Sequence, residues 1–252
     1  MLARERQKLI HQRLELDGRV VANELAAEFN VSEDSIRRDL REMAAAQQCE
    51  RVYGGALRLD RMTPMQDRQQ IDVAAKRKLA RAVVSSFKQG GSIFIDASST
   101  NLEIVRAIAA GFSLTVFTNA PIIAASLADN VDVNVILIGG RLTSGVGACV
   151  DSRAIQDALL INPDLYVMGV CGLSDALEVT TEHHGDAVFK RVIAERASQI
   201  IVPITKSKLG RSNRYTIMSL DEKIRLVATD VVGHELDVYR DCGCEIEIVS
   251  VS

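Results

Sequence analysis

The fold of this chain is decided by residues 31–40, which read Val31-Ser32-Glu33-Asp34-Ser35-Ile36-Arg37-Arg38-Asp39-Leu40. Ser32 is placed to cap a helix by accepting a backbone N–H, and the two acidic residues after it suit the positive end of the helix dipole. Ile36, Leu40 and Met43 recur at i, i+4 and i+7, which predicts one buried face. The arginines then point away from that face, as in a helix that contacts DNA phosphates and base edges.

The segments around this helix predict a winged helix-turn-helix domain. Residues 3–16 and 22–29 have helical patterns, Asp17-Gly18-Arg19 separates them, and Asn30-Val31 predicts a tight turn into the arginine helix. Behind that helix, Arg51-Val52-Tyr53-Gly54-Gly55-Ala56 predicts a hairpin that forms the wing. Two neighbouring arginines alone more often form only a solvated surface, so this order of elements is what favours DNA binding.

We therefore expect a double-stranded DNA operator as the partner. The residues predicted to contact it are Ser35, Arg37, Arg38 and Arg41 on the helix and Arg51 and Tyr53 on the wing. Residues 1–60 nevertheless contain ten basic and eleven acidic residues, so the net charge of this region is about −1. Positive charge must therefore be concentrated on one face of this winged domain, and a single copy of the domain should bind DNA weakly. A homo-oligomer, dimer or tetramer, would compensate by presenting several heads to repeated half-sites.

Composition indicates a cytoplasmic protein without a resident metal or cofactor. Among the 252 residues, no apolar run is long enough to span a membrane, and the first residues lack the apolar core of a signal peptide. The five cysteines contain no CxxC pair, which argues against a zinc ribbon or a disulfide framework. Cys242-Gly243-Cys244 and His183-His184 are the remaining metal or redox candidates, and neither has a further ligand indicated by its spacing.

From Ser92 onward, short Val/Ile-rich runs alternate with helical stretches. The runs are 93–95, 114–117, 133–138, 165–170, 200–204 and 224–228, with a last alternating run at 245–251. This pattern predicts an α/β domain with a mostly parallel sheet covered by helices on both faces. We expect a winged domain at 1–59, a linker and the start of a connecting helix at 60–75, and an α/β domain for effector sensing and oligomerisation at 76–252. Residues 60–68 form the linker in this prediction, and residues 69–87 form one helix.

Polar residues follow the predicted strands at the edge where ligands bind in such sheets. Asp96-Ala97-Ser98-Ser99-Thr100-Asn101 follows the first strand and precedes a helix. One Ser or Thr there is explained as an N-cap, whereas three in a row favour a phosphate site. We expect a phosphorylated sugar or related metabolite to contact Asp96, Ser98, Ser99, Thr100, Thr118, Asn119, Gly139, Gly140, Arg141, Lys190 and Lys208.

Residues 2–57 closely resemble the N-terminal domain of the DeoR family of bacterial transcription regulators. The matching residues are Gly18-Arg19-Val20, Glu24-Leu25-Ala26, Val31-Ser32, Ile36-Arg37-Arg38-Asp39-Leu40 and Gly54-Gly55-Ala56. Tyr53 stands where the family usually has His, and Gln47-Gln48 stand where it often has Gly at the end of the recognition helix. The resemblance implies a DNA-binding regulator, a repressor of a carbohydrate operon.

Residues 76–230 resemble the sensor domain of the same family, which is similar in fold to ribose-5-phosphate isomerase. The family's Asp-x-Gly-Thr/Ser-Thr, Thr-Asn-Ser and Asp-x-Ser-Lys-x-Gly appear with substitutions as Asp96-Ala97-Ser98-Ser99-Thr100, Thr118-Asn119-Ala120 and Thr205-Lys206-Ser207-Lys208-Leu209-Gly210. The Gly of the family's Gly-Thr/Ile-Thr motif is replaced in Glu178-Val179-Thr180. These departures leave the identity of the effector open.

An isomerase-like enzyme with an appended DNA-binding head is the alternative. The isomerase motif Asp-Gly-Ala-Asp-Glu supplies carboxylates for proton transfer. The comparable stretch here is Met168-Gly169-Val170-Cys171-Gly172, in which both acids at the end of that motif are replaced. No Ser/His/Asp grouping indicates a nucleophile, so we predict no enzyme activity. A scaffold with an inert pocket is a third class, and it would require the arginine face to be incidental.

Overall fold

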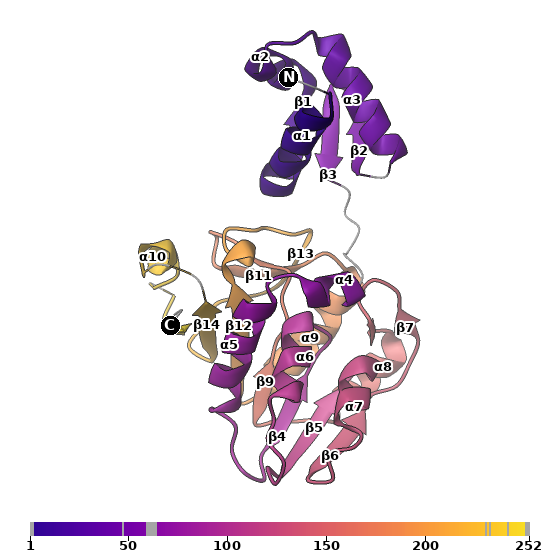
Figure 1. Cartoon of the computed structure of the whole chain (residues 1–252). Helices are drawn as coiled ribbons and strands as arrows, with labels where there is room; N and C mark the ends of the chain where they lie inside the picture. The colour runs from indigo at the N-terminus through magenta and orange to yellow at the C-terminus, as the bar shows by residue number, and fades with distance from the viewer. Residues whose placement is uncertain are drawn as a thin grey trace. The chain divides into compact units, whose positions relative to one another are not determined.

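The computed structural model describes residues 3–46, 48–58, 65–229, 231, 233–240 and 242–249. The chain divides into two compact units, Met1–Arg61 and Met62–Ser252, which we call the head and the sensor (Figure 1). Among the described residues, no helix has the length and apolar character needed to cross a membrane.

The head is a winged helix-turn-helix domain, as predicted. Its helices are α1 (Ala3–Asp17), α2 (Ala22–Phe29) and α3 (Glu33–Ala45), and its strands are β1 (Arg19–Val21), β2 (Cys49–Val52) and β3 (Gly55–Arg58). The strands form an antiparallel sheet in the order β1-β3-β2. Asn30 adopts the left-handed conformation (φ 50°) that ends α2, and Ser32 Oγ accepts the Ser35 N–H at 3.2 Å to cap α3.

The three head helices enclose a small apolar core. Ile36, Leu40 and Met43 are buried there as their spacing predicts, together with Ile10 and Leu14 of α1. Beside this core, the buried guanidinium of Arg6 pairs with Asp39 at 2.5 Å and so joins α1 to α3. The helical pattern did not single out this ion pair.

The Gly54-Gly55 turn of the wing is required by backbone geometry. Gly54 has φ 82°, a conformation that favours glycine. A Cβ at Gly55 would lie 2.0 Å from the carbonyl oxygen of Val20, because β3 passes directly beside β1. The glycine pair therefore permits the close strand approach that forms the wing.

The sensor contains a seven-stranded, entirely parallel sheet. Its strands are β4 (Ser92–Ile95), β5 (Leu114–Thr118), β6 (Val133–Leu137), β9 (Leu165–Val167), β12 (Gln199–Thr205), β14 (Ile224–Thr229) and β15 (Glu245–Val249). Their order is β15-β14-β12-β9-β4-β5-β6, so the direction of winding reverses between β4 and β9. In this pair Phe94 lies opposite Tyr166, and their rings meet edge to face with centroids 5.4 Å apart.

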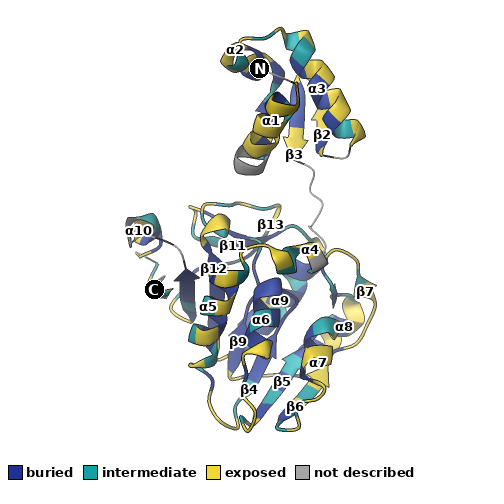
Figure 2. Cartoon of the chain, viewed as in Figure 1, coloured by how far each residue is buried: buried dark blue, intermediate teal, exposed yellow. Residues whose placement is uncertain are grey.

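Helices cover both faces of this sheet. Helices α5 (Val73–Val84), α6 (Ser99–Arg106) and α7 (Pro121–Leu127) are neighbours, whereas α8 (Ser152–Ala158) packs on α9 (His184–Arg196). Right-handed crossovers on the two sides of the reversal place these groups on opposite faces. The buried residues of the sheet and of the inward helix faces form one continuous core (Figure 2).

Several short elements were not predicted from the sequence. Strands β10 (Gly172–Leu173), β11 (Glu178–Thr181) and β13 (Tyr215–Ser219) form a small antiparallel sheet, and β7 (Leu142–Thr143) pairs with β8 (Ala148–Cys149). The 3₁₀ turns Lys206–Lys208 and Gly233–Leu236 and the helix α10 (Asp237–Arg240) were not predicted either. Strand β9 also ends at Val167, earlier than the run 165–170 predicted.

The predicted single helix at 69–87 is wrong. The structure has α4 (Met65–Gln70), then a break, then α5 from Val73. Asp72 at the break has φ 51°, a left-handed conformation that interrupts the helix although the apolar spacing continues. Of the residues predicted as a linker, 60–64 lie outside the described residues and 65–68 belong to α4.

Candidate functional site

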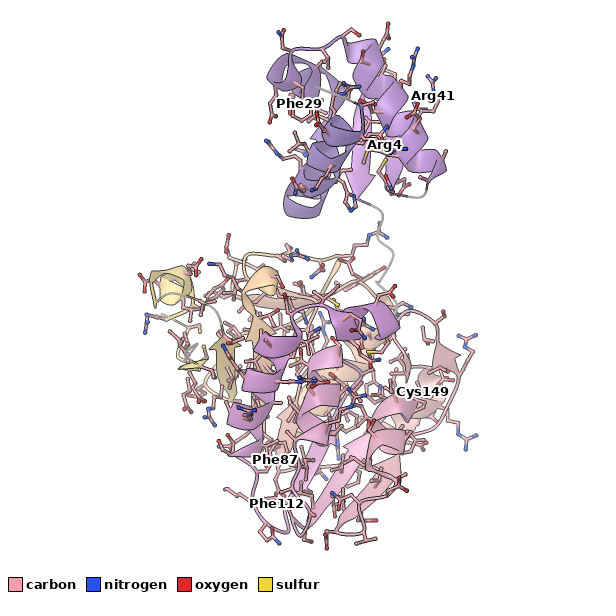
Figure 3. All side chains as sticks on the ribbon, in the orientation of Figure 1. Arg4, Phe29, Arg41, Phe87, Phe112 and Cys149 are labelled. Carbon is pink, nitrogen blue, oxygen red and sulfur yellow. The ribbon has the colours of Figure 1, made fainter. Side chains whose placement is uncertain are left out.

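The exposed face of α3 carries the arginines that the sequence singled out. Arg37, Arg38 and Arg41 are all exposed, and Arg41 extends away from the head core (Figure 3). Arg37 Nη2 pairs with Glu33 at 2.7 Å, a contact that solvent weakens. Within the described residues, the side chains of Arg38 and Arg41 form no ion pair or hydrogen bond. Their guanidinium groups are therefore available to an external partner.

The acidic residues of α3 are largely engaged within the head. Glu33 pairs with Arg37, Asp39 is buried against Arg6, and Glu42 accepts a hydrogen bond from Gln7 at 2.8 Å. The negative net charge of the head is thus compatible with a locally positive helix face.

The remaining predicted DNA contacts lie at the start of α3 and on the wing. Ser35 is half-buried, and its hydroxyl lies 2.9 Å from the Ser32 hydroxyl. Arg51 of β2 is exposed, and Tyr53 at the tip of the wing is fully exposed. The Tyr53 ring therefore makes little contact within the head and stands at the tip of the wing, where it was predicted to contact DNA.

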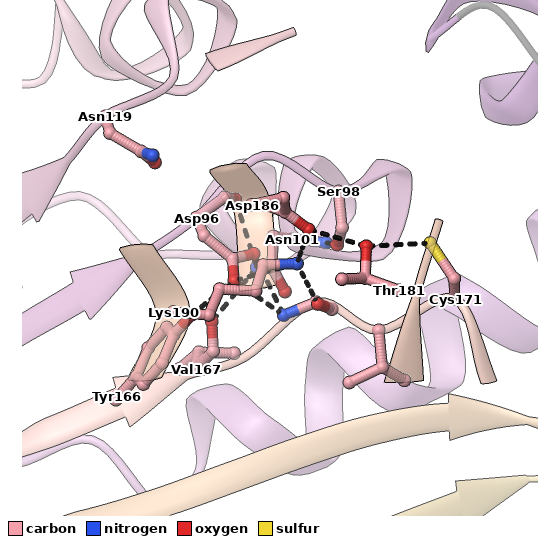
Figure 4. Close-up of polar contacts among 12 residues, drawn as sticks. Asp96, Ser98, Asn101, Asn119, Tyr166, Val167, Cys171, Thr181, Asp186 and Lys190 are labelled. Carbon is pink, nitrogen blue, oxygen red and sulfur yellow. Dashed lines mark hydrogen bonds and ion pairs between the residues drawn. The ribbon is translucent and has the colours of Figure 1, made fainter. Parts of the chain in front are cut away.

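Asp96 is the centre of a polar cluster at the carboxyl edge of the parallel sheet. It follows β4 at the reversal of strand order and is 1% exposed. Its carboxylate accepts hydrogen bonds from the Gly169 N–H at 2.9 Å, the Tyr166 hydroxyl at 2.6 Å and Asn101 Nδ2 at 2.8 Å (Figure 4). Four elements, β4, β9, α6 and the segment after β9, thereby meet on one side chain.

Lys190 of α9 connects a second carboxylate to this cluster. Its ammonium lies 2.9 Å from Asp186 and 3.6 Å from Asp96, and it donates to the Gly169 carbonyl at 2.5 Å. Asp186 also accepts the Thr181 hydroxyl at 2.7 Å. Lys190 was predicted to contact an effector, and the structure shows that internal partners already engage it.

Burial and charge oppose each other at these groups. Burial disfavours the charged form of Lys190, but the carboxylates of Asp186 and Asp96 outweigh this and raise its pKa. Burial raises the pKa of Asp96 above its ordinary value, and the charge of Lys190 opposes this rise only in part. The three donors and the lysine that surround its two oxygens nevertheless favour the ionised carboxylate.

The hydroxyl residues after Asp96 have different partners. Ser98 Oγ caps α6 by accepting the Asn101 N–H at 2.9 Å, so capping explains one of the three hydroxyls. Ser99 and Thr100 are buried in the first turn of α6, and Thr100 Oγ1 has no partner among the described residues. Buried hydroxyls without partners are uncommon in folded proteins, which makes this position receptive to a ligand.

Two further predicted residues lie at the end of β5, next to β4. Thr118 Oγ1 accepts the Ala120 N–H at 3.1 Å, and Asn119 Nδ2 donates to the Cys149 carbonyl at 3.0 Å. Asn119 Oδ1 is buried without a partner among the described residues. In the close-up no contact joins Asn119 to the Asp96 cluster (Figure 4).

Gly139, Gly140 and Arg141 follow the edge strand β6 and are exposed. They are arranged around Asp151, whose carboxylate accepts the Arg141 N–H at 3.0 Å and caps α8. A Cβ at Gly140 would lie 2.4 Å from Asp151 Oδ1, so a structural reason accounts for this glycine. None of the three has a contact with Asp96 or Lys190 within the described residues.

Lys208 lies in the turn after β12 and donates to the Val170 carbonyl at 2.7 Å. That carbonyl follows Gly169, whose N–H and C=O contact Asp96 and Lys190. A Cβ at Gly169 would lie 2.4 Å from Ser98 Cβ and 2.7 Å from Asp96 Oδ1. Glycine is therefore required where the segment after β9 passes the Asp96 cluster.

Sequence reasoning missed Asn101, Tyr166 and Asp186 as members of this site. Asn101 Nδ2 also donates to the Val167 carbonyl and so joins α6 to β9. The one signal for Asp186 was its i, i+4 spacing from Lys190 on a helix. Tyr166 lies within an apolar run, and only the fold reveals its bond to a residue seventy positions away.

The residues considered for metal or redox chemistry do not form a metal site in the part of the chain that the structure describes. No group of three or more His, Cys, Asp or Glu side chains is arranged to hold an ion there. His184 packs against the Tyr215 ring, and Cys242 and Cys244 are free thiols with sulfur atoms 2.9 Å apart.

Fold and site together define a winged helix-turn-helix DNA-binding protein with an α/β sensor domain. Residues 6–62 match the model of the DeoR-like helix-turn-helix domain, and residues 71–231 match that of the DeoR C-terminal sensor domain. The chain belongs to the DeoR family of DNA-binding transcription regulators.

The relatives that this chain resembles are named as transcription regulators. The chain is 32% identical to the HTH-type transcriptional regulator GlpR of Haloferax volcanii, over 91% of each chain. It is 29% identical to the glycerol-3-phosphate regulon repressor of Escherichia coli K12, over 82% of this chain and 83% of that protein. It is 28% identical to the L-fucose operon activator of the same strain, over 82% and 86% respectively.

Among solved structures, ribose 5-phosphate isomerase A from Methanocaldococcus jannaschii aligns with 55% of each chain at 14% identity and a TM-score of 0.41. A likeness at this level supports no conclusion about activity.

Proposed function

We propose that this protein represses a carbohydrate operon and that a phosphorylated sugar or related metabolite controls it. Operator contacts come from Ser35, Arg37, Arg38 and Arg41 of α3 and from Arg51 and Tyr53 of the wing. The observation that carries this assignment is the pair of exposed arginines, Arg38 and Arg41, left without partners on a capped helix of a winged head. Such a helix can place its arginines against phosphates and guanine edges.

The effector is proposed to bind at the carboxyl edge of the sensor sheet. Support comes from the Asp96 cluster at the reversal of strand order and from the unpartnered Thr100 hydroxyl and Asn119 oxygen. Relatives named for glycerol-3-phosphate and L-fucose regulation favour a carbohydrate-derived ligand. A homo-oligomer acting in the cytoplasm completes the proposal, because one head of negative net charge would bind weakly.

Catalysis has no part in this proposal. Cys171 and Gly172 stand where an isomerase-type motif would supply carboxylates. Cys171 Sγ instead lies 3.6 Å from the Thr181 hydroxyl, and Gly172 fits against Arg211. No general base is placed at that position.

Thermal unfolding against paired phosphorylated and unphosphorylated sugars tests the sensing function. A ligand at a hundred times its Kd should stabilise the state it binds by roughly 2.7 kcal/mol. We expect a phosphorylated compound to raise Tm while its parent sugar does not, and to weaken binding to DNA from beside the protein's own gene. Stabilisation by parent sugars alone, or a stabilising compound without effect on DNA affinity, would contradict the proposal.

A further inference from the structure

Arg68 of α4 lies near the carboxyl edge of the sensor sheet, and its guanidinium group forms few hydrogen bonds there. Its Nη2 donates to the Gly145 carbonyl at 3.3 Å, and its Nε is buried with no partner among the described residues. Asp96, Asp186 and Cys171 all lie within electrostatic reach of this guanidinium. Burial lowers the pKa of Arg68, so the fold places a cation where its charge is disfavoured.

Two lysines share this environment. Lys76 of α5 is 4% exposed and donates to the carbonyls of Arg68 and Ile71, each at 2.5 Å. Lys208 donates to the Val170 carbonyl. Within the described residues none of these three cations pairs with a carboxylate. The nearby carboxylates have other contacts: Asp96 and Asp186 pair with Lys190, and Glu103 pairs with Arg77 and Arg106. Asp72, whose charge favours the protonated form of Lys76, accepts a hydrogen bond from the Ser207 hydroxyl at 3.1 Å.

The cations also act on one another. Burial lowers the pKa of Lys208 to about 8; Cys171 opposes this shift, whereas Lys76, Arg68 and Lys190 add to it. Mutual repulsion among buried cations is relieved when an anion enters between them. The first turn of α6 adds the unpartnered Thr100 hydroxyl to this region, and α4 packs against α6.

We propose that a phosphate-type dianion binds between Arg68 of α4, Lys208 and the first turn of α6, and that α4 transmits its presence to the head. This inference rests on the sensing function proposed above. Arginine suits such a group because its fork of donors matches phosphate oxygens. Lys76 acts as a positioning residue, since its two carbonyl bonds fasten the end of α4.

Transmission follows from the place of α4 in the chain. It is the first described element after the head, and Met65 at its start packs on the sensor core. A helix of only six residues can be shifted by a new charge-assisted contact. Bound anion would exchange the long Arg68 bond to Gly145 for shorter ones and fix α4 in one position.

The test compares wild-type protein with Arg68→Met and Lys208→Met, using inorganic phosphate as the first probe and the best stabilising sugar phosphate as the second. Arg81→Met removes an exposed arginine of α5 and is the matched control. We expect Kd to rise roughly tenfold or more in the first two variants and to stay unchanged in the control. Unchanged Kd in Arg68→Met would overturn the proposal while leaving the sensing function intact.

Hydrogen exchange of residues 65–70 tests the transmitting role. Ligand should slow this exchange in the wild type and leave it unaltered in Arg68→Met at the same fractional occupancy. If the wild type binds the ligand but hydrogen exchange of residues 65–70 does not change, then α4 does not transmit binding. A wild-type protein that binds no phosphate-bearing compound refutes this inference and the proposed phosphorylated effector together. Retained Tm without ligand shows that a variant is folded, and Arg68→Lys should recover part of the affinity.

Discussion

At the scale of single residues, Asp96 has the largest consequences in the sensor. It is buried, and its carboxylate accepts hydrogen bonds from three other residues. Together with Asp186, it pairs with the ammonium group of Lys190. Removing its carboxylate leaves the buried Lys190 with one carboxylate partner and leaves the Tyr166 hydroxyl and the Gly169 N–H without their acceptor, whereas Asn101 Nδ2 keeps the Val167 carbonyl. Its importance is therefore structural as well as chemical.

We predict that Asp96→Ala lowers the free energy of unfolding by about 3–5 kcal/mol, as expected when one partner of a buried ion pair is lost. It should also abolish the effector response. The head is a separate compact unit, so binding of ligand-free protein to DNA should persist below the lowered Tm. Urea unfolding and DNA titration measure the two effects; a normal effector response in this variant would place the site elsewhere.

The lowered pKa of Lys208 predicts how effector binding depends on pH. Its pKa in the ligand-free protein is lowered to about 8, and an adjacent anion should raise it towards the ordinary value. Well below pH 8 the lysine is already charged, so its contribution to affinity is constant. Between about pH 8 and 10 binding must take up a proton, and affinity should fall as pH rises.

Calorimetry at pH 8.5 in two buffers of different ionisation enthalpy measures that proton uptake. Lys208→Arg keeps its charge at this pH and should abolish the proton uptake. Cys171→Ser shows whether the neighbouring thiol contributes to that uptake. Equal heats in both buffers for the wild type would show that Lys208 does not adjoin the anion.

At the scale of elements, periodicity predicted those parts whose burial alternates regularly. The apolar spacing of α3 and the Val/Ile runs of the sheet are examples. The break between α4 and α5 escaped because Asp72 adopts a left-handed conformation that apolar spacing does not reveal. The small strands β7, β8 and β10 are only two residues long, too short to show an alternation.

The site was predictable to the extent that its residues adjoin strand ends. Asp96, the hydroxyls after it and Lys208 were found in this way, although their contact with an effector stays a prediction. Asn101, Tyr166 and Arg68 were missed because their importance arises from partners far along the chain. Motif spacing carries no information about such contacts.

The pairing of α1 with α3 gives a prediction at this scale. Asp39→Ala should lower the free energy of unfolding of the head by about 3–5 kcal/mol, because it leaves Arg6 buried without its counterion. Replacing both residues, Arg6→Met with Asp39→Leu, should recover most of the loss. Unfolding followed by circular dichroism provides the measurement, and additive losses in the double variant would show that the pair is not coupled.

At the scale of the whole molecule, DNA binding depends on the distribution of charge rather than its sum. The chain carries a net charge of −3, yet Arg38 and Arg41 remain unpaired on one helix face. Each phosphate contact should contribute a salt slope of about −0.9 in log K against log salt concentration. A slope well beyond what one head supplies is expected if two or more heads bind together.

The measurement that tests the account most directly is fluorescence anisotropy of a labelled DNA fragment from beside the protein's own gene. Wild type, Arg38→Ala and the head control Lys8→Ala are titrated with and without the stabilising sugar phosphate. We predict that Arg38→Ala loses about 1–3 kcal/mol on this fragment and less on random DNA, that Lys8→Ala matches the wild type, and that ligand shifts wild-type affinity. Equal wild-type affinity for the fragment and for random DNA, unaffected by ligand, would contradict the account.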